Sequence, residues 1–349
     1  MKKLLFFIFC IYTTTVQAQP AGYYTSALGK NGVQLQSELK NIIDNHSVQS
    51  YPLWSAFSST DNKGNNVLWD MYSDVPGGTS SYTYTLVSDQ CGQYNSEGDC
   101  YNHEHVWPKN YFNDASPMNS DLHHIIPTDG WVNNKRANFP IGEVSSVSWT
   151  GSNGSRTGSS NSYVGYSGNV FEPIDAYKGD IARMYFYMST RYKGEDNSWN
   201  NWEMANKAVL TSDAIQMLLQ WHADDTVSQK EIDRNNAIYN IQGNRNPFVD
   251  YPIFANCIWG TADCTPLNIQ EVLQAKIELY PNPSKDEIIV RLPNALQNQS
   301  VVFEVYNVYG QKVLASKQYK IYIKDLLHGM YTVRILTEKD VYSTHFIKE

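Results

Sequence analysis

Apolar side chains recur at helical spacing in the first three quarters of the chain. The segment LQSELKNIIDNH, residues 35–46, has leucine or isoleucine every third or fourth position, and GDIARMYFYMSTRY, residues 179–192, repeats this spacing. Asp180 lies where a helix start favours an acidic side chain. A third helix is predicted over 228–243, which opens with the Ser-x-x-Glu pattern of a capping box and closes on glycine. The Gly-, Ser- and Asn-rich stretch 151–168 predicts a long loop, either a functional flap or a mobile excursion.

The pattern changes after Cys264. From Ile277 onward, short segments alternate between apolar and polar positions, as at 288–290 and again along 302–306. The dipeptide Tyr-Gly at 309–310 marks a hairpin turn. These features predict a small antiparallel β-sandwich at the C-terminus.

Length and composition are those of an exported protein with two domains. The chain has 349 residues with 42% hydrophobic and 18% charged side chains, enough to bury a core in each part. At its start, two lysines precede an apolar run that is too short to span a bilayer, and small residues follow at positions 16 and 18. We therefore predict a signal peptide at 1–18, a first domain at 19–268, a linker at 269–276 and the β-sandwich at 277–349.

Export determines how the cysteines are interpreted. Removal of the signal peptide leaves four cysteines in an oxidising compartment, namely Cys91, Cys100, Cys257 and Cys264. We expect two disulfides, and the local pairing of 91 with 100 and of 257 with 264 requires no long-range closure. Each small loop would contribute roughly 2 to 3 kcal/mol. A zinc site built from the same thiols is the alternative, although no C-x-x-C spacing supports it.

The stretch YNHEHVWPKN, residues 101–110, begins a concentration of histidines. Four of the eight histidines in the chain lie between 103 and 124. They could be hydrogen-bonded structural residues, or zinc ligands drawn from His103, His105 and either His123 or His124. A third interpretation uses one histidine as a base beside oxygen ligands for a hard metal ion, which is the arrangement found in nucleases.

Phosphodiester hydrolysis requires a nucleophilic water, positive charge on the phosphate oxygens and help for the leaving oxygen. His105 suits the role of base, because a neutral imidazole accepts a proton at physiological pH. The carboxylate of Glu104 and the amide oxygen of Asn133 suit Mg²⁺, which needs few protein ligands. Neighbouring strand residues point to opposite faces, so Glu104 and His105 can share a site only if the strand ends there. Pro108 makes such an ending plausible.

These residues also resemble a known family. HEHVWP, DLHHIIPTDGWVNNKRANFPIG, KGDIARMYFYMSTRY and RNNAIYNIQGNRNPFVDYP are similar, in order and over about residues 30–260, to blocks of the endonuclease I family of secreted or periplasmic bacterial nucleases. The resemblance implies a His-Me finger (ββα-metal) fold of the α+β class, products with 5′-phosphate ends, His105 as general base, and Glu104 and Asn133 as ligands of one Mg²⁺. It implies that Arg136 and Asn138 are fixed parts of the helix DGWVNNKRAN. Asp121 and His124 belong to a matched block, and His124 is expected either to orient the helix or to touch substrate.

The sequence also departs from the family. Some members carry an arginine between the two halves of the motif to hold the scissile phosphate, whereas residues 109–120 offer only Lys109. Arg136 or Arg183 could substitute, or either could serve as a structural ion pair. The net charge of the chain is −8, and residues 19–274 contain 15 basic and 27 acidic side chains, a difference of −12. Binding of a polyanion must therefore depend on a local basic face and be sensitive to salt.

The last 73 residues, 277–349, resemble the C-terminal sorting domain of the type IX secretion system, through YPNP at 280–283, VYNVYGQKV and LLHGMYTVRI. A carbohydrate-binding or adhesive β-module is the alternative for this domain. Together the features predict a secreted or cell-surface, magnesium-dependent, nonspecific endonuclease, with Ca²⁺ or Mn²⁺ as alternative ions. Its expected partners are DNA, with RNA as a second substrate, and the secretion machinery; we expect a monomer without stable membrane insertion. A zinc-dependent hydrolase and a non-enzymatic surface adhesin are the competing functions.

Overall fold

The computed structural model describes residues 19–160, 162–264, 277–292, 296, 301–307, 311–337 and 341–349. The chain forms two compact units, one containing Gln36–Thr261 and the other Ala262–Glu349 together with Tyr24–Leu35. The predicted signal peptide, the linker at 269–276 and the hairpin turn at 309–310 lie outside the described residues. Among the helices of the described ranges, none combines the length and the apolar character that crossing a membrane requires.

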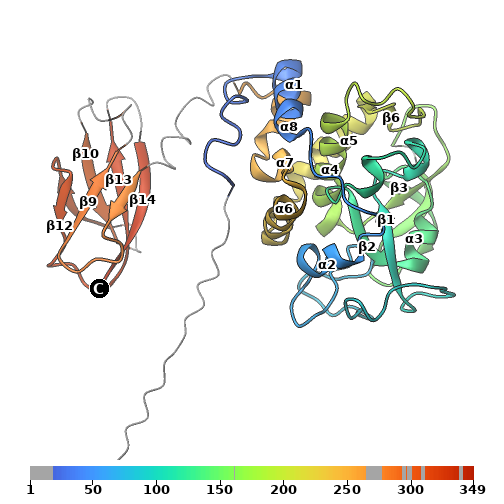
Figure 1. Ribbon diagram of the computed structural model, residues 1–349, viewed down its shortest axis with the longest axis horizontal. Helices are drawn as coiled ribbons and strands as arrows, with labels where there is room; N and C mark the ends of the chain where they lie inside the picture. The colour runs from blue at the N-terminus through green and yellow to red at the C-terminus, as the bar shows by residue number, and fades with distance from the viewer. Residues whose placement is uncertain are drawn as a thin grey trace, which may run out of the picture. The chain divides into compact units, whose positions relative to one another are not determined.

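Two strands and a helix form a continuous unit in the first part of the chain (Figure 1). Strand β1, Tyr101–His105, pairs antiparallel with β2, Ile125–Asp129, and α3, Gly130–Arg136, follows β2 without a loop. The side chain of Asp129 starts the helix by accepting a hydrogen bond from the backbone N–H of Val132. As expected, β1 ends at His105. The helix was expected to include Asn138 but ends at Arg136, so Asn138 lies exposed beyond it, and its backbone carbonyl accepts a hydrogen bond from the Tyr111 hydroxyl.

The helices of the first part of the chain confirm the three predicted helical segments. Helix α1 spans Gly32–Ile43, and α6, Gln229–Gln242, has the predicted capping box at its start and Gly243 in the left-handed conformation at its end. Helix α4 begins at Asp175 and ends at Arg191, so the prediction that Asp180 marks its start is wrong. The error has a physical reason, because nearly the whole of α4 is buried and its polar residues face partners inside the protein. The remaining helices are α2 (Trp54–Thr60), α5 (Ser212–Asp224), α7 (Pro247–Asp250), α8 (Ile253–Trp259) and the 3₁₀ turns η1 (Lys109–Tyr111) and η2 (Met118–Ser120).

The stretch predicted as a long loop at 151–168 instead contains a strand. Strand β4, Arg156–Ser160, is the central strand of an antiparallel sheet between β3, Val144–Thr150, and β5, Asn169–Glu172. Gly158 is required there, because an added Cβ would lie 2.0 Å from the backbone oxygen of Ser146. The loop prediction failed because small residues in this strand permit close strand packing, which composition alone does not reveal. A short hairpin joins β6, Ala205–Asn206, to β7, Val209–Leu210.

The described strands of the C-terminal unit form two antiparallel sheets with one shared core, in agreement with the predicted sandwich. The larger sheet has the order β11-β10-β13-β14 and the smaller one β12-β9-β8. Phe303 and Val305 from the first sheet and Ile288 and Val290 from the second belong to one apolar cluster. The strands are β8 (Glu278–Tyr280), β9 (Glu287–Arg291), β10 (Val302–Tyr306), β11 (Lys312–Ser316), β12 (Lys320–Tyr322), β13 (Gly329–Leu336) and β14 (Val341–Lys348).

A disulfide closes the loop that precedes β1, and a backbone hydrogen bond joins this loop to the start of α3. Cys91 is bonded to Cys100, as predicted, and Cys257 and Cys264 are disulfide-bonded as well. The backbone N–H of Gly130 donates to the carbonyl of Cys100 over 2.9 Å. A Cβ at Gly130 would lie 2.8 Å from the sulfur of Cys91, so only glycine fits. The first turn of α3 is therefore positioned by a covalently closed loop.

Candidate active site

His105 occupies the last position of β1, and its ring is held in one orientation. The ring nitrogen Nε2 lies 3.3 Å from the backbone carbonyl oxygen of Asn119 in η2. A carbonyl oxygen only accepts hydrogen bonds, so Nε2 carries the proton and donates it. The other nitrogen, Nδ1, therefore has the free lone pair and can take a proton from a water molecule.

The surroundings of the His105 ring keep it uncharged. The ring is buried among those of Tyr51, Phe112 and His124, whose centroids lie 5.9, 6.0 and 5.6 Å away. Burial, followed by the nearby His124, lowers the pKa of His105 to about 3. The imidazole is therefore neutral at physiological pH, which is the state that a general base requires.

Glu104 is buried and is held through one of its two oxygens. The hydroxyl of Tyr72 donates to Oε1 over 3.0 Å, and Nε of Arg136 lies 2.9 Å from the same oxygen. Within the described part of the chain, no group donates a hydrogen bond to Oε2. Burial raises the pKa of Glu104 to about 7, although Arg136 and the Tyr72 hydroxyl act in the opposite direction. A buried carboxylate with one unengaged oxygen is suited to binding a cation.

The side-chain amide of Asn133 on α3 is oriented by β1. Its Nδ2 donates to Oδ1 of Asn102 over 2.7 Å and to the backbone carbonyl of His103 over 3.1 Å. Because a backbone carbonyl only accepts, the nitrogen end of the amide faces β1, and Oδ1 remains for another partner. Among the described residues, no hydrogen bond or ion pair joins Glu104, His105 and Asn133 to one another. The ββα unit thus presents one neutral imidazole and two side-chain oxygens that do not contact one another.

Arg136 supports this arrangement from inside the protein. Its guanidinium is fully buried, and its Nη2 and Nη1 atoms donate to the carbonyls of Val106 over 2.5 Å and Ala137 over 2.8 Å. The Nε atom pairs with Glu104 by charge but is not aligned for a hydrogen bond. Arg136 therefore fixes the Glu104 carboxylate and the backbone just after His105. This position favours the supporting role over direct contact with a phosphate.

Arg183, the other arginine considered for the phosphate, is also buried. Its Nε and Nη2 atoms donate to the carboxylate of Glu231 over 2.5 and 2.9 Å, and Nη1 donates to the carbonyl of Asp225 over 2.8 Å. Asp180 lies 3.8 Å away. The guanidinium of Arg183 is thus surrounded by two carboxylates and one carbonyl. It links α4 to α6 and has a structural role.

Lys109 and Tyr51 are more accessible than the two arginines. The side chain of Lys109 is 54% exposed, although it forms an ion pair of 2.6 Å with Asp114. Its charge also acts on His105, after burial and His124, which places it close to the ring. Tyr51 is 46% exposed, and its ring lies on those of His103 and His105, at 5.1 and 5.9 Å between centroids.

Asp121 is a buried junction rather than a metal ligand. Its Oδ2 accepts hydrogen bonds from the hydroxyls of Tyr187 at 2.8 Å and Tyr192 at 2.7 Å, and its Oδ1 accepts from the side chain of Gln242 and the backbone of His123, both at 3.0 Å. Four donors occupy both oxygens. Burial by itself raises the pKa of Asp121. The nearby histidine rings and the hydrogen bond from Gln242 lower this pKa by more than burial raises it, so the net shift is downward.

Replacing Asp121 with asparagine is expected to reduce the free energy of unfolding by about 1 to 3 kcal/mol at pH 7, because the charge that orders four donors is lost. The folded-state pKa is below the unfolded value of about 3.9, so the contribution is complete above that value and is lost as pH falls toward the folded pKa. The difference between wild type and variant should therefore narrow in urea unfolding at pH 3. A difference that stays constant from pH 7 to pH 3 would contradict this role. Asp233→Asn, at an exposed position on α6, is the control and should have no effect.

The other three clustered histidines have structural partners. Nε2 of His103 accepts the backbone N–H of Leu53 at 3.0 Å, so its lone pair is occupied. His123 and His124 place Nε2 at 3.2 and 2.8 Å from the carbonyls of Asn244 and Met118. Across the described ranges, no group of three or more His, Cys, Asp or Glu side chains could hold a metal ion. The geometry of the described residues therefore does not favour the zinc interpretation, and the His124 ring contacts η2 through Met118.

A comparison with known sequences identifies the larger unit. The model of the family described as Endonuclease I matches residues 31–253. The chain belongs to this family. The match confirms the resemblance noted in the four sequence blocks and shows that the protein is a nuclease.

Similar proteins carry the names of extracellular nucleases or of an endonuclease-1. An extracellular ribonuclease of Bacillus amyloliquefaciens is 34% identical over 255 residues, covering 70% of this chain and 80% of its own. An endonuclease-1 of Buchnera aphidicola subsp. Baizongia pistaciae is 30% identical over 132 residues, covering 38% and 46%. An extracellular deoxyribonuclease of Aeromonas hydrophila is 28% identical over 134 residues, covering 38% and 50%.

The C-terminal unit has a separate assignment. The model of the secretion system C-terminal sorting domain matches residues 278–349. This endonuclease I protein is therefore directed to the secretion machinery and is secreted or located at the cell surface, as the extracellular relatives also indicate. The adhesive interpretation of this unit is not needed.

Sequence reasoning did not find Asn119, Tyr72 and Tyr51. Asn119 contributes a backbone carbonyl, which any residue type supplies, so no side-chain signal exists. Tyr72 and Tyr51 lie outside the endonuclease I motifs in sequence and reach Glu104 and His105 only through the fold. A search for polar or aromatic residues shared by the family outside its motifs would be the signal to use.

Proposed function

We propose that the protein is a sugar-nonspecific endonuclease of the His-Me finger type that hydrolyses phosphodiester bonds in DNA and RNA with a single bound Mg²⁺. The observation that carries the proposal is the His105 ring, whose Nε2 is bound to the Asn119 carbonyl and whose Nδ1 is left as a neutral base. The ββα order of β1, β2 and α3 agrees with this fold type.

The residues present fit a hard divalent ion. Within the described residues, Glu104 Oε2 and Asn133 Oδ1 are the oxygens of these two side chains that have no hydrogen-bond or ion-pair partner, and both belong to the same ββα unit. Oxygen ligands and a small ligand number suit Mg²⁺ and Mn²⁺ and permit Ca²⁺. When bound, the ion would supply positive charge to the phosphate oxygens and the leaving 3′ oxygen.

The side chains of the protein supply the base and hold the site in position. His105 Nδ1 takes the proton of the attacking water, and the resulting imidazolium is stabilised because Nε2–H already donates to a fixed carbonyl. Tyr72 and Arg136 hold the Glu104 carboxylate in one position, and Arg136 also holds the carbonyl of Val106 beside His105. The base and the ligand carboxylate therefore keep their relative position without rearrangement.

The names of the relatives support activity on both RNA and DNA. A relative that covers 70% of this chain is named a ribonuclease, and a relative that covers 38% of it is named a deoxyribonuclease. Water activated by His105 attacks phosphorus directly, so the 2′-hydroxyl of RNA is not needed as a nucleophile. An enzyme of this kind tolerates ribose and deoxyribose.

The proposal is tested with three labelled oligonucleotides of one sequence, namely DNA, RNA and 2′-O-methyl RNA. With Mg²⁺ all three should be cut to products that carry 5′-phosphates, and a chelator should abolish cleavage. Cleavage that persists with chelator, or RNA products ending in 2′,3′-cyclic phosphates, would show that another mechanism operates. If none of the three oligonucleotides is cut with Mg²⁺, Mn²⁺ or Ca²⁺, the proposal is refuted.

Lys109→Met is expected to raise the KM for nucleic acid and to reduce the slope of log binding constant against log salt by about one, as the loss of one phosphate contact predicts. The reason is that Lys109 is an accessible cation close to His105, whereas Arg136 and Arg183 are buried. Binding is measured by fluorescence anisotropy at several salt concentrations. Lys312→Met removes a similarly exposed, ion-paired lysine from the C-terminal unit and should leave the slope unchanged. An equal slope for wild type and Lys109→Met would exclude the contact.

A further inference from the structure

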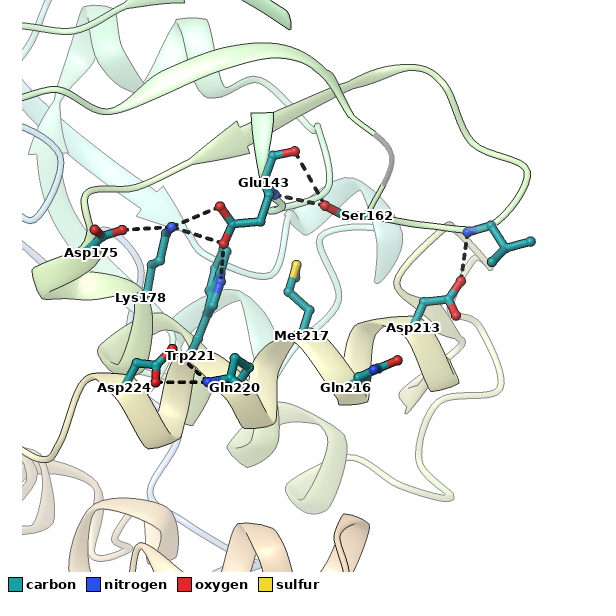
Figure 2. A pocket seen from close by; sticks show the side chains of 11 residues that line it. Glu143, Ser162, Asp175, Lys178, Asp213, Gln216, Met217, Gln220, Trp221 and Asp224 are labelled. Carbon is teal, nitrogen blue, oxygen red and sulfur yellow. Dashed lines mark hydrogen bonds and ion pairs between the residues drawn. The ribbon is translucent and has the colours of Figure 1, made fainter. Parts of the chain in front are cut away.

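A large cavity lies away from the His105 site. It has a volume of about 710 Å³ and is lined by residues of α4 and α5, by Glu143 just before β3, and by Ser162 and Val164 after β4. None of its lining residues belongs to β1, β2 or α3. The volume is in the range of small-molecule sites. Figure 2 shows side chains of α5 along one side, with Glu143 and Ser162 facing them.

One face of α5 combines acidic ends with an apolar middle. Asp213 and Asp224 are eleven residues apart, which is close to three full turns, so both project from the same side of the helix, roughly 16 Å apart along its axis. Met217 and Trp221 line the cavity between them. Val164, opposite, is 92% exposed and adds a further apolar surface.

The cavity is negatively charged. Four carboxylates line it, those of Glu143, Asp175, Asp213 and Asp224, against the single ammonium of Lys178. That ammonium is already occupied, because it lies 3.0 Å from Glu143, 3.0 Å from Glu172 and 2.8 Å from Asp175. The cavity therefore repels the phosphates of a nucleic acid and attracts cations.

The geometry favours an organic cation over a metal ion. Across the described part of the chain, no three carboxylate or imidazole groups are arranged to hold a metal. Asp213 and Asp224 lie too far apart to share one ion, and the space between them is lined by a thioether and an indole. A ligand that fits has positive groups at both ends and methylene groups between them.

We infer that this cavity binds a linear aliphatic polyamine, with terminal ammonium groups at Asp213 and Asp224 and its methylene chain over Met217 and Trp221. Asp213 Oδ2 accepts the backbone N–H of Val164 at 2.8 Å, and both oxygens of Asp224 accept from Gln220 at 2.9 Å, so both carboxylates are held in place before a ligand arrives. The inference is independent of the proposed nuclease mechanism, since it uses none of the His105 site.

The test is isothermal titration calorimetry of the full-length protein, free of nucleic acid, with spermine at fixed ionic strength. We expect one saturable site. The double variant Asp213→Asn/Asp224→Asn should bind at least about tenfold more weakly, because two charge contacts are lost. Met217→Lys, which places a cation in the middle of the cavity, should abolish binding. Circular dichroism and thermal unfolding establish that each variant is folded.

The matched control is Asp233→Asn/Glu278→Gln, which removes the same charge from exposed positions outside the cavity. Asp233 accepts a hydrogen bond from Gln229 one turn earlier on its helix, as Asp224 does from Gln220. Equal weakening in this control, displacement of spermine by Mg²⁺ at the same ionic strength, or binding of butylamine as tight as that of spermine would each overturn the inference. Any of these would indicate general attraction to an acidic protein.

Discussion

Replacing His105 with alanine is expected to lower kcat for nucleic acid hydrolysis by about 10²- to 10⁴-fold, with little change in KM. The loss follows from removal of the neutral base, which the other histidines of the cluster cannot replace. The Nε2 lone pair of His103 is occupied by the backbone N–H of Leu53, and His123 and His124, which also place Nε2 against backbone carbonyls, are 2% and 0% exposed. The measurement is steady-state cleavage of a labelled duplex at saturating Mg²⁺. Added imidazole should restore part of the rate in the alanine variant.

The control for this prediction is His103→Gln, two positions earlier on the same strand. Glutamine can still accept the backbone N–H of Leu53, so the fold is retained and kcat should change by no more than a few-fold. The pH profile supplies a second measure, because the lowered pKa keeps His105 neutral from about pH 8 to about pH 5. A rate that falls with an apparent pKa near 6.5 would contradict the lowered pKa of His105, whereas an alanine variant with full activity would refute its assignment as base.

Glu104→Gln is expected to weaken the apparent affinity for Mg²⁺ by at least about 100-fold, because the only charged ligand of the proposed site is lost. The same change leaves the buried guanidinium of Arg136 without its counter-charge, which should cost about 3 to 5 kcal/mol of stability. Activity is measured against Mg²⁺ concentration at a temperature where the variant is folded. Unfolding in urea measures the second effect.

Tyr72→Phe separates the loss of Mg²⁺ affinity from the loss of stability. It removes the hydroxyl that donates to Glu104 Oε1 but keeps the carboxylate and its pairing with Arg136. The expected result is a loss of about 1 kcal/mol in stability and a loss of about tenfold or less in activity. If Glu104→Gln instead shows an unchanged Mg²⁺ dependence while remaining folded, Glu104 is not a metal ligand and acts only through Arg136.

Local features of the sequence were sufficient for much of the fold. The capping box before Gln229 and the glycine after α6 are local signals, since each depends on hydrogen bonds within one turn. The end of β1 at His105 and the pairing of Cys91 with Cys100 also follow from nearby residues. By contrast, β4 was missed because its stability depends on two partner strands, β3 and β5, rather than on its own composition.

By itself, the sequence determined which chemistry is available: an imidazole at 105 beside a carboxylate at 104, an amide at 133, and a C-terminal β-domain of the sorting type. Only the tertiary structure decided which atoms remain free to react. From the sequence alone, Arg136 and Arg183 were equally good candidates for binding the phosphate. In the structure both are buried and form ion pairs with Glu104 and Glu231, so both have structural roles. The reason is physical, because burial and hydrogen-bond partners come from residues distant in the chain, whereas motif spacing records only near neighbours.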